Sequence, residues 1–146
     1  MSEKSPQVRS FQDLKVWKRA RRVQRMVAQI VISFPNYEEY RLKDQMIRSS
    51  RSIARNIAEG YGRYHYQENI QFCRQSRGSL SELLNDLLTA LEEKYIKRNE
   101  YDDARNEIEN CHKLLNGYIR YLKKAKENYT AEEKDTIYDA FTEPNN

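Results

Sequence analysis

The sequence predicts an all-α protein: an antiparallel up-down four-helix bundle with a short C-terminal helical tail. Its 146 residues suit a single domain. The chain contains only 4 Gly and 3 Pro, about 5% of the residues against a usual ~12%, so it has little material for the tight turns of β-sandwiches and barrels. Along four long segments, apolar residues recur at alternating steps of three and four, which is the spacing of the buried seam in packed helices.

The first helix is predicted from Ser10 to Phe34. Ser10 is followed three residues later by Asp13, so the two residues form a candidate capping box at the helix start. Pro35 ends the segment, because the residue before a proline disfavours helical backbone. The predicted buried seam consists of Trp17, Ala20, Gln24, Val27, Val31 and Phe34.

The second helix is predicted to begin near Glu38 and to end at the loop of residues 60–62, and the third covers residues 66–96. The links between the helices are short, so consecutive helices are expected to be antiparallel neighbours. The seam of the second helix comprises Leu42, Met46, Ser49, Ile53, Asn56 and Gly60. The seam of the third comprises Ile70, Cys73, Arg77, Leu80, Leu84, Leu87 and Leu91.

The fourth helix is predicted to start at Asn99 as N-cap, with Asp102 at the third helical position. Its seam comprises Tyr101, Ala104, Ile108, Cys111, Leu115, Tyr118 and Leu122. Residues 1–127 therefore form the predicted bundle domain. Residues 128–146 form the tail, which is expected to be a short fifth helix or a docking arm and begins at a further candidate capping box, Thr130 to Glu133.

The location of the protein is predicted from what the sequence lacks. No apolar stretch approaches the ~18 residues that a transmembrane helix needs, and residues 1–10 lack the apolar run of a signal peptide. We therefore expect a cytoplasmic protein with no membrane partner. Cys73 and Cys111 are too few for a disulfide framework, so both are expected to be reduced.

The residues required for common enzymatic reactions are also scarce. His65 and Glu68 form one turn of a possible metal motif, but a di-metal helical bundle needs a second copy of that unit. A P-loop, a G-x-S-x-G elbow and paired metal-binding cysteines are absent from the sequence. Cys111 and His112 are adjacent, but this cysteine lies on a core seam, where a thiol is usually inert. We expect no enzymatic activity, no metal and no cofactor.

The formal net charge of +4 conceals an asymmetry along the chain. Residues 1–80 carry 16 basic and 7 acidic side chains, whereas residues 81–146 carry 10 basic and 15 acidic ones. Such a division is typical of a first half that binds an anionic partner, or of a head-to-tail contact between unlike halves of two copies. Composition leaves both possibilities open.

The cations of the first half are ordered into stripes along the outer faces of the first two helices. Twelve of the 16 are Arg, whose guanidinium binds phosphate through two parallel hydrogen bonds and stacks on bases. Three interpretations are open: a solvated outer face, an acidic protein surface as partner, or nucleic acid bound through its backbone. The candidate nucleic-acid-binding residues are Lys15, Lys18, Arg22, Arg25, Arg41, Arg48, Arg51, Arg55 and Arg63.

Polar residues that interrupt the apolar seams form a second candidate site. They are Gln24, Asn56, Glu59 and Arg77. A buried arginine needs a partner, since an unpaired buried charge costs several kcal/mol, and Glu59 is the best candidate for Arg77. The set either fixes the helix register or lines a ligand pocket. Gly78, next to Arg77, is costly inside a helix and suggests close approach of a neighbouring backbone.

Several blocks of sequence resemble a known family. The blocks are Phe11-x-Asp13-Leu14-x-Val16-Trp17-x-x-Ala20, Phe34-Pro35-x-x-Glu38, Leu42-x-x-Gln45-x-x-Arg48-Ser49-Ser50-x-Ser52-Ile53, Asn56-Ile57-Ala58-Glu59-Gly60, Gly62-Arg63 and Arg77-Gly78-Ser79-Leu80-x-Glu82-Leu83. In these residues, and across about residues 11–122, the chain resembles the four-helix bundle proteins that are also called ribosomal-RNA intervening-sequence proteins. Members of that family are encoded inside insertions in bacterial 23S rRNA genes.

The resemblance implies a homopentameric ring of bundles with a central channel. More remotely, the chain is similar to accessory proteins of diversity-generating retroelements, which bind nucleic acid and a reverse transcriptase through a basic surface. It departs from the family pattern at Arg55, where members often carry Pro or a small residue, and at Cys73, where they often carry Leu. Arg55 adds a charge to the basic stripe.

These observations predict a non-enzymatic, homo-oligomeric helical bundle that binds nucleic acid, RNA in preference to DNA, through the basic surface of its first two helices. A reverse transcriptase is a further possible partner implied by the resemblance. The alternative is a scaffold whose charges serve ring assembly, with no nucleic-acid ligand. In a ring one surface patch meets a different one, so unlike charges on the two halves of the chain would favour assembly.

Overall fold

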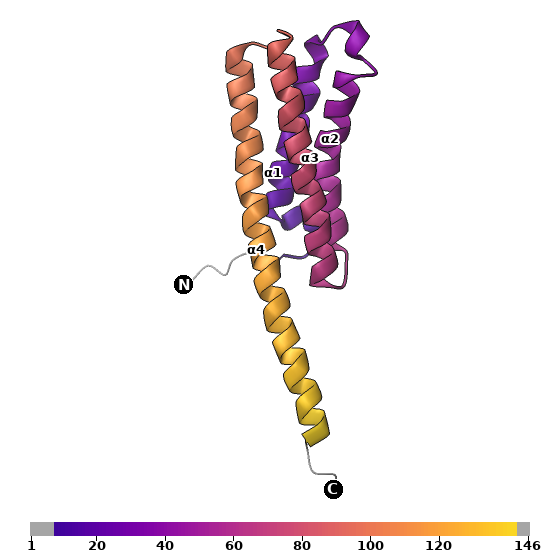
Figure 1. Cartoon of the computed structure of the whole chain (residues 1–146), viewed down its shortest axis with the longest axis vertical. Helices are drawn as coiled ribbons and strands as arrows, with labels where there is room; N and C mark the ends of the chain where they lie inside the picture. The colour runs from indigo at the N-terminus through magenta and orange to yellow at the C-terminus, as the bar shows by residue number, and fades with distance from the viewer. Residues whose placement is uncertain (1–7, 143–146) are drawn as a thin grey trace.

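The computed structural model describes the backbone of residues 8–142 and the side chains of residues 8–129, and this part of the chain is helical without strands, as predicted. Four long helices form the bundle (Figure 1). The elements in chain order are η1 (Phe11–Asp13), α1 (Lys15–Ile30), η2 (Val31–Ser33), η3 (Asn36–Glu38), α2 (Leu42–Tyr61), α3 (Tyr66–Glu92) and α4 (Arg98–Thr142).

The four helices are arranged as an antiparallel square. Helix α1 packs against α2 and α4, and α3 packs against the same two neighbours. The α1–α2 and α3–α4 connections lie at one end of the bundle, which we call the apical end (Figure 1). The α2–α3 loop, residues 62–65, and the start of α1 lie at the other, which we call the basal end. The predicted up-down topology is therefore confirmed.

The predicted capping box forms, but it caps a single 3₁₀ turn ahead of α1. The hydroxyl of Ser10 accepts a hydrogen bond from the backbone N–H of Gln12 (3.1 Å), and the Asp13 carboxylate accepts from the backbone N–H groups of Ser10 and Arg9 (3.2 and 3.0 Å). These backbone bonds lower the pKa of Asp13, because they favour the ionised carboxylate. Helix α1 itself begins at Lys15, five residues later than predicted.

The inner face of α1 differs from the predicted seam. Its buried residues are Val16, Ala20, Val23 and Val27. The predicted seam shares Ala20 and Val27 with this face but places Trp17 and Gln24 where the structure has Val16 and Val23. Trp17 and Gln24 are half-buried at the edge of the helix. The two stripes are one residue apart, and the inner position goes to the smaller, fully apolar side chains.

Helix α2 packs against α3 through small residues. The Ser76 hydroxyl donates to the backbone carbonyl of Ile53 across the interface (2.7 Å), and the hydroxyls of Ser52 and Ser79 lie 2.9 Å apart. Such short side chains let the two helix backbones approach closely. Gly78 does not serve this purpose, contrary to the prediction, because it is exposed and nothing lies within 4 Å of a Cβ built on it.

The C-terminal tail continues α4 instead of forming a fifth helix. Helix α4 runs without a break from Arg98 to Thr142, and it extends beyond the basal end of the bundle (Figure 1). The only Gly in this range is Gly117, and the first Pro follows at Pro144, so the sequence offers nothing to interrupt the helix. The predicted boundary at residue 127 therefore falls inside one helix, and the predicted box at residues 130–133 lies beyond the described side chains.

The start of α4 also differs from the prediction, by two residues. The helix begins at Arg98, and the Glu100 carboxylate accepts a hydrogen bond from the backbone N–H of Lys97 (3.0 Å). This contact satisfies a donor that precedes the first turn. Asn99 is therefore inside the helix and does not act as the predicted N-cap.

Both cysteines lie in the core, as their seam positions predicted. Cys73 and Cys111 are free thiols with no exposed surface. Burial raises the pKa of each to about 12, so both thiols are protonated at neutral pH. Within residues 8–142, no helix is long and apolar enough to span a membrane.

Candidate nucleic-acid interface

Helix α1 carries six Lys and Arg side chains and no Asp or Glu. The four that the sequence predicted as ligands of phosphate, Lys15, Lys18, Arg22 and Arg25, are all exposed and lie opposite the buried valines. A helix with this composition concentrates positive potential on one side of the bundle, because no carboxylate on the same helix offsets it. The two remaining cations, Arg19 and Arg21, were not predicted as site residues.

One carboxylate of α4 binds two of the α1 cations. Glu107 forms ion pairs with Arg22 (2.9 Å) and Arg19 (3.5 Å), and its side chain is only 18% exposed. Arg22 is therefore held towards α4 and is less available to a ligand than its position on α1 suggests. Arg21 lies over the ring of Trp17, 5.5 Å from the ring centroid, in a cation–π contact. The Trp17–Arg21 contact has the i, i+4 spacing that brings helix side chains together, so the sequence carried a signal for it, whereas the Glu107 contacts depend on the packing of α4 against α1.

The predicted cations of α2 and of the loop after it divide into paired and unpaired residues. Arg48 pairs with Asp44 on α2 (3.0 Å), and Arg63 in the loop pairs with Glu59 on the last turn of α2 (3.5 Å). Such exposed pairs stabilise a helix by only about 0.3–0.5 kcal/mol, so a phosphate can compete for either arginine. Among the side chains that the structure describes, the predicted cations without an ion-pair partner are Lys15, Lys18, Arg25, Arg41, Arg51 and Arg55.

The antiparallel packing of α1 and α2 brings two groups of predicted residues to the basal end. The start of α1 with Lys15 lies at the same end as the last turns of α2, which carry Arg55, and the α2–α3 loop, which carries Arg63. Phe11 of η1 lines a shallow hollow of about 500 Å³ together with Arg55 and Arg63. Arg41 and Arg48 lie towards the apical end. The predicted residues therefore form an elongated surface, and no cleft contains all of them.

The predicted polar seam is not one network. Arg77 is half-buried and donates a hydrogen bond to Asn116 Oδ1 on α4 (3.2 Å), whereas Glu59 is exposed and binds Arg63. The predicted Arg77–Glu59 ion pair is therefore wrong. Glu59 lines the hollow that also contains Phe11 of η1, and no residue of α3 lines that hollow. The amide suffices for Arg77, since its guanidinium stays partly in water.

The other two seam residues have separate environments. The Asn56 amide donates to the carbonyl and hydroxyl oxygens of Ser52, both at 2.9 Å, and this contact supports the Ser52–Ser79 bond between α2 and α3. Gln24 is half-buried on α1. The four predicted residues thus lie in four separate environments and do not form one polar site.

A polar groove of about 700 Å³ runs between α2 and α3. Its lining residues are Gln45, Arg48, Ser49, Ser52, Arg55, Ser79, Ser81, Glu82, Asn85 and Asp86. The two arginines come from α2 and the two carboxylates from α3, so the groove has no surplus of charge. Burial, reinforced by the neighbouring Glu82 carboxylate, raises the pKa of Asp86.

This shift predicts a pH-dependent effect of one substitution. Because the pKa of Asp86 is higher in the folded than in the unfolded state, ionisation of Asp86 opposes folding at neutral pH, and protonation at acid pH removes that cost. We expect Asp86→Asn to raise the free energy of unfolding slightly at pH 7 and to have no such benefit near pH 3, as measured by urea unfolding at both pH values. An equal effect at both pH values would contradict the role of ionisation.

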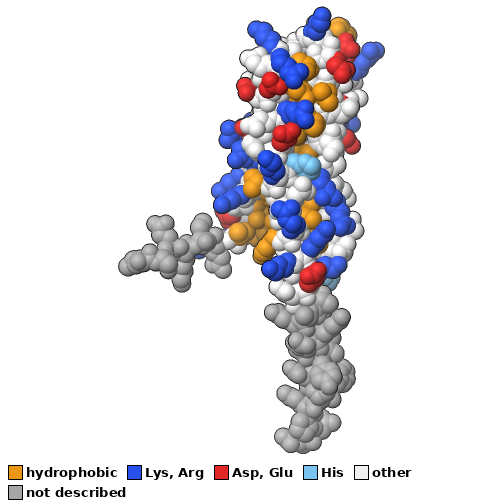
Figure 2. All heavy atoms as spheres, turned by 60° about the vertical axis from the view of Figure 1, so that its left-hand side comes forward, with side chains coloured by type: hydrophobic (Ala, Val, Ile, Leu, Met, Phe, Trp, Pro, Cys, Tyr) orange, Lys and Arg blue, Asp and Glu red, His pale blue; other side chains and the backbone are white. Residues whose placement is uncertain are grey.

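A third group of cations was missed because the half-chain charge sum hides it. Between residues 111 and 126, α4 carries five Lys and Arg side chains and no Asp or Glu, although residues 81–146 as a whole are acidic. The five are Lys113, Arg120, Lys123, Lys124 and Lys126. In Figure 2, Lys and Arg side chains lie on both halves of this face of the molecule, whereas most of the Asp and Glu side chains lie in its apical half.

The fold places the protein in the class of antiparallel four-helix bundles, here with a basic first helix and a serine-rich contact between α2 and α3. Among residues 8–129, no group of three or more His, Cys, Asp or Glu side chains is placed to hold a metal ion. A family model for the 23S rRNA-intervening sequence proteins matches residues 12–117. The chain belongs to that family, as its sequence blocks predicted.

A solved structure shares the fold. It is the crystal structure of a protein of unknown function from the S23 ribosomal protein family of Bacteroides thetaiotaomicron, with a TM-score of 0.66 and 23% sequence identity. The match covers 72% of this chain and 95% of that chain. No curated protein matches the sequence. Neither the family nor the solved structure indicates an enzymatic activity.

Proposed function

We propose that this chain is a non-enzymatic accessory protein that binds nucleic acid, RNA in preference to DNA, through the exposed cations of α1 and α2. The observation that carries the proposal is the composition of α1, where six cations face no carboxylate on their own helix. A surface that served only as a solvated face would have no need of a single sign of charge, and exposed helix faces commonly mix both signs.

The kind of contact follows from the geometry. The predicted cations are all exposed, and six of them lack an ion-pair partner among the described side chains. Arg48 and Arg55 also line the polar groove between α2 and α3, but the nine cations are spread over an elongated surface, which suits contacts to phosphates along a backbone. Binding is therefore proposed to be dominated by the backbone charge and to release counterions. The family's name, which refers to a ribosomal RNA gene, supports the preference for RNA.

The test is a fluorescence anisotropy titration of a labelled RNA hairpin, and of a DNA hairpin of the same sequence, at about 50 and 200 mM salt. The affinity for RNA is expected to fall by at least tenfold between the two salt concentrations. The triple variant Arg48→Gln, Arg51→Gln, Arg55→Gln is expected to bind at least tenfold more weakly at low salt and to have a shallower salt dependence, because each lost phosphate contact lowers the slope by roughly 0.9.

A matched control removes three cations from the apical end: Lys94→Gln, Lys97→Gln, Arg98→Gln. All three residues are exposed, so the net charge changes by the same amount at a different place. Equal weakening by the two triple variants would indicate a nonspecific effect of net charge, and no binding at low salt would contradict the proposal. The latter result would favour the scaffold whose charges serve assembly into a ring.

The homo-oligomer and the reverse transcriptase partner are also proposals. Light scattering on the purified protein tests the homo-oligomer.

A further inference from the structure

The basal end of the bundle brings together parts of α3 and α4 that are far apart in the sequence. The Asn69 amide donates a hydrogen bond to the Tyr118 hydroxyl (3.3 Å), and the rings of Tyr66 and Tyr129 meet edge to face with 6.1 Å between centroids. Both contacts join the start of α3 to the second half of α4. The α2–α3 loop, residues 62–65, therefore lies at the same end as the basic segment of α4.

Two of the tyrosine rings at this end are more than half exposed to solvent. Tyr64 in the loop is 84% exposed, and its ring lies 5.1 Å from the His65 ring between centroids, with the planes at 87°. Tyr121 on α4 is 64% exposed and stacks on Tyr118, with the planes at 14° and the centroids 6.4 Å apart. The Tyr118 ring lies nearly parallel to Tyr121 and offset from it, and most of the Tyr121 ring is open to solvent, so a flat ligand can stack on its exposed face.

The same end holds the excess positive charge of the molecule. We divided α2 and α3 at the Ser52–Ser79 hydrogen bond, and α1 and α4 after residues 20 and 111, a division that the Arg19–Glu107 ion pair crosses. The basal segments, residues 8–20, 53–78 and 112–129, carry 13 Lys and Arg against 4 Asp and Glu. The apical segments, residues 21–52 and 79–111, carry 11 against 12. Figure 2 shows exposed hydrophobic side chains between the basal cations.

Exposed rings interleaved with cations suit a particular chemical class of ligand. In a single strand the base faces are accessible, and bases stack on aromatic side chains while cations bind the phosphates. In a duplex the base faces are covered by their neighbours, so the rings would contribute nothing. We propose that the basal end binds single-stranded nucleic acid, with bases stacked on Tyr64 and Tyr121 and the phosphates bound by the α4 cations. This inference rests on the proposed function and adds a second surface to it.

The apical end provides an internal comparison. Tyr40 there is 91% exposed, more than either basal tyrosine, but the apical segments have no excess of cations. An exposed tyrosine alone is therefore not the basis of the proposal. The combination of exposed rings with a basic segment of α4 that lacks carboxylates occurs at the basal end, and Tyr40 supplies a matched control.

The test compares single-stranded oligouridylate, single-stranded oligothymidylate and an RNA duplex, each titrated with the full-length chain by anisotropy. The ring-removing variants are Tyr64→Ala and Tyr121→Ala, and the ring-keeping variants are Tyr64→Phe and Tyr121→Phe. We expect each alanine variant to bind both single strands about 5- to 100-fold more weakly, since base stacking on one aromatic ring is worth this much. The phenylalanine variants and Tyr40→Ala are expected to bind like the parent chain.

The duplex distinguishes the two proposals. Duplex affinity is expected to be unchanged in all tyrosine variants, because phosphate contacts alone hold the duplex. If the chain binds the duplex and both alanine variants bind single strands as well as the parent does, the basal site is wrong and the proposed function stands. If the parent binds none of the three probes at low salt, both proposals fail. If Tyr40→Ala weakens single-strand binding equally, the basal location is overturned.

Discussion

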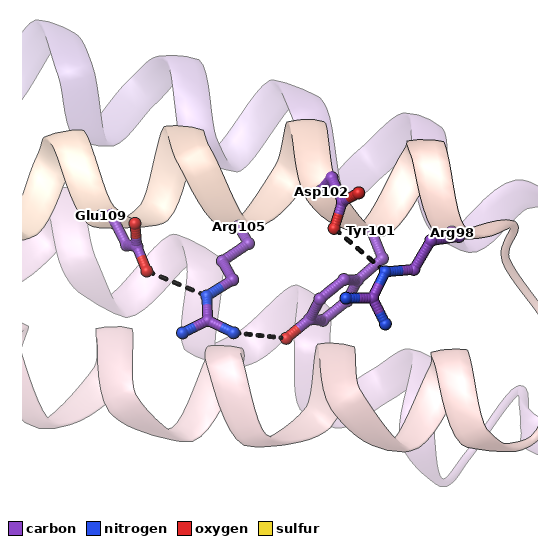
Figure 3. A network of polar contacts seen from close by, with 5 residues as sticks. All are labelled: Arg98, Tyr101, Asp102, Arg105 and Glu109. Atoms are coloured by element: carbon purple, nitrogen blue, oxygen red, sulfur yellow. Dashed lines mark hydrogen bonds and ion pairs between the residues drawn. The ribbon is translucent and has the colours of Figure 1, made fainter.

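Replacing Tyr101 by alanine is expected to lower the free energy of unfolding by about 3–5 kcal/mol, the cost of removing a large buried ring and leaving a cavity. Tyr101 is 2% exposed and is among the largest fully buried side chains of the described core. Its ring lies near the start of α4 with the hydroxyl pointing towards Arg105 (Figure 3). Urea unfolding followed by far-ultraviolet circular dichroism measures the difference directly.

The control for this prediction is Tyr101→Phe, which keeps the ring and removes only the hydroxyl. Arg105 Nη1 donates to that hydroxyl (3.1 Å), but its Nε still donates to the Glu109 carboxylate (2.9 Å), so the guanidinium keeps a partner (Figure 3). The Arg98 guanidinium lies 5.5 Å from the centroid of the residue 101 ring, and this cation–π contact is also kept in the phenylalanine variant. We expect a loss of about 1 kcal/mol. A phenylalanine variant as unstable as the alanine variant would show that the polar network, and not burial, is the main term.

The second large effect is expected at Gly60. A Cβ at this position would lie 2.6 Å from Asn69 Oδ1 and 3.0 Å from both the Asn69 carbonyl oxygen and Phe72 Cβ. Asn69 cannot easily move away, because it is buried and bonded to Tyr118. The higher helix propensity of alanine stabilises the fold by about 1 kcal/mol. Overpacking costs about 1–3 kcal/mol, and the backbone at Asn69 must also shift to make room. We therefore expect Gly60→Ala to be destabilising overall. Thermal unfolding checks the sign.

Gly78→Ala provides the matched comparison on the facing helix. Gly78 lies within α3, is exposed, and has no atom within 4 Å of the added Cβ. Only the helix propensity term remains, so this variant is expected to stabilise the fold by about 0.5–1 kcal/mol. The two glycine substitutions should therefore have opposite signs. A stabilising Gly60→Ala would contradict the close α2–α3 packing that the structure shows there.

The helical bundle could be predicted from the sequence because the relevant signals are local and repeated. The 3–4 spacing of apolar residues over each segment, Pro35 and the scarcity of glycine all indicate long antiparallel helices. The prediction was wrong about which face of α1 is buried. A stripe through Trp17 and Gln24 has the same period as one through Val16 and Val23. Only the positions of α2 and α4 decide which of the two faces the core, and that is a tertiary property.

The candidate site was predictable in part for the same reason. Outward cations on α1 and α2 follow from periodicity, and all nine predicted residues are exposed. Whether a cation is paired depends on neighbours from other helices, as Glu107 shows for Arg22. The basic segment of α4 was present in the sequence, but a sum over residues 81–146 cancelled it against the acidic residues on either side. The net charge of a segment of about two to four helical turns indicates the charge of one end of the bundle, because a segment of that length lies at one end. A sum over half of the chain combines segments from both ends.

Because helix α4 is unbroken, the rotation of the C-terminal extension about the helix axis is fixed relative to the bundle. An α-helix turns by about 100° and rises 1.5 Å per residue, so the extension beyond the bundle points in a direction set by the residue count between the basal core and its end. Insertion of one residue after Glu127 would rotate everything beyond it by about 100°, whereas insertion of seven would nearly restore the original orientation. The number of residues in the extension therefore sets two properties together: how far the extension reaches beyond the bundle, and in which direction its end faces.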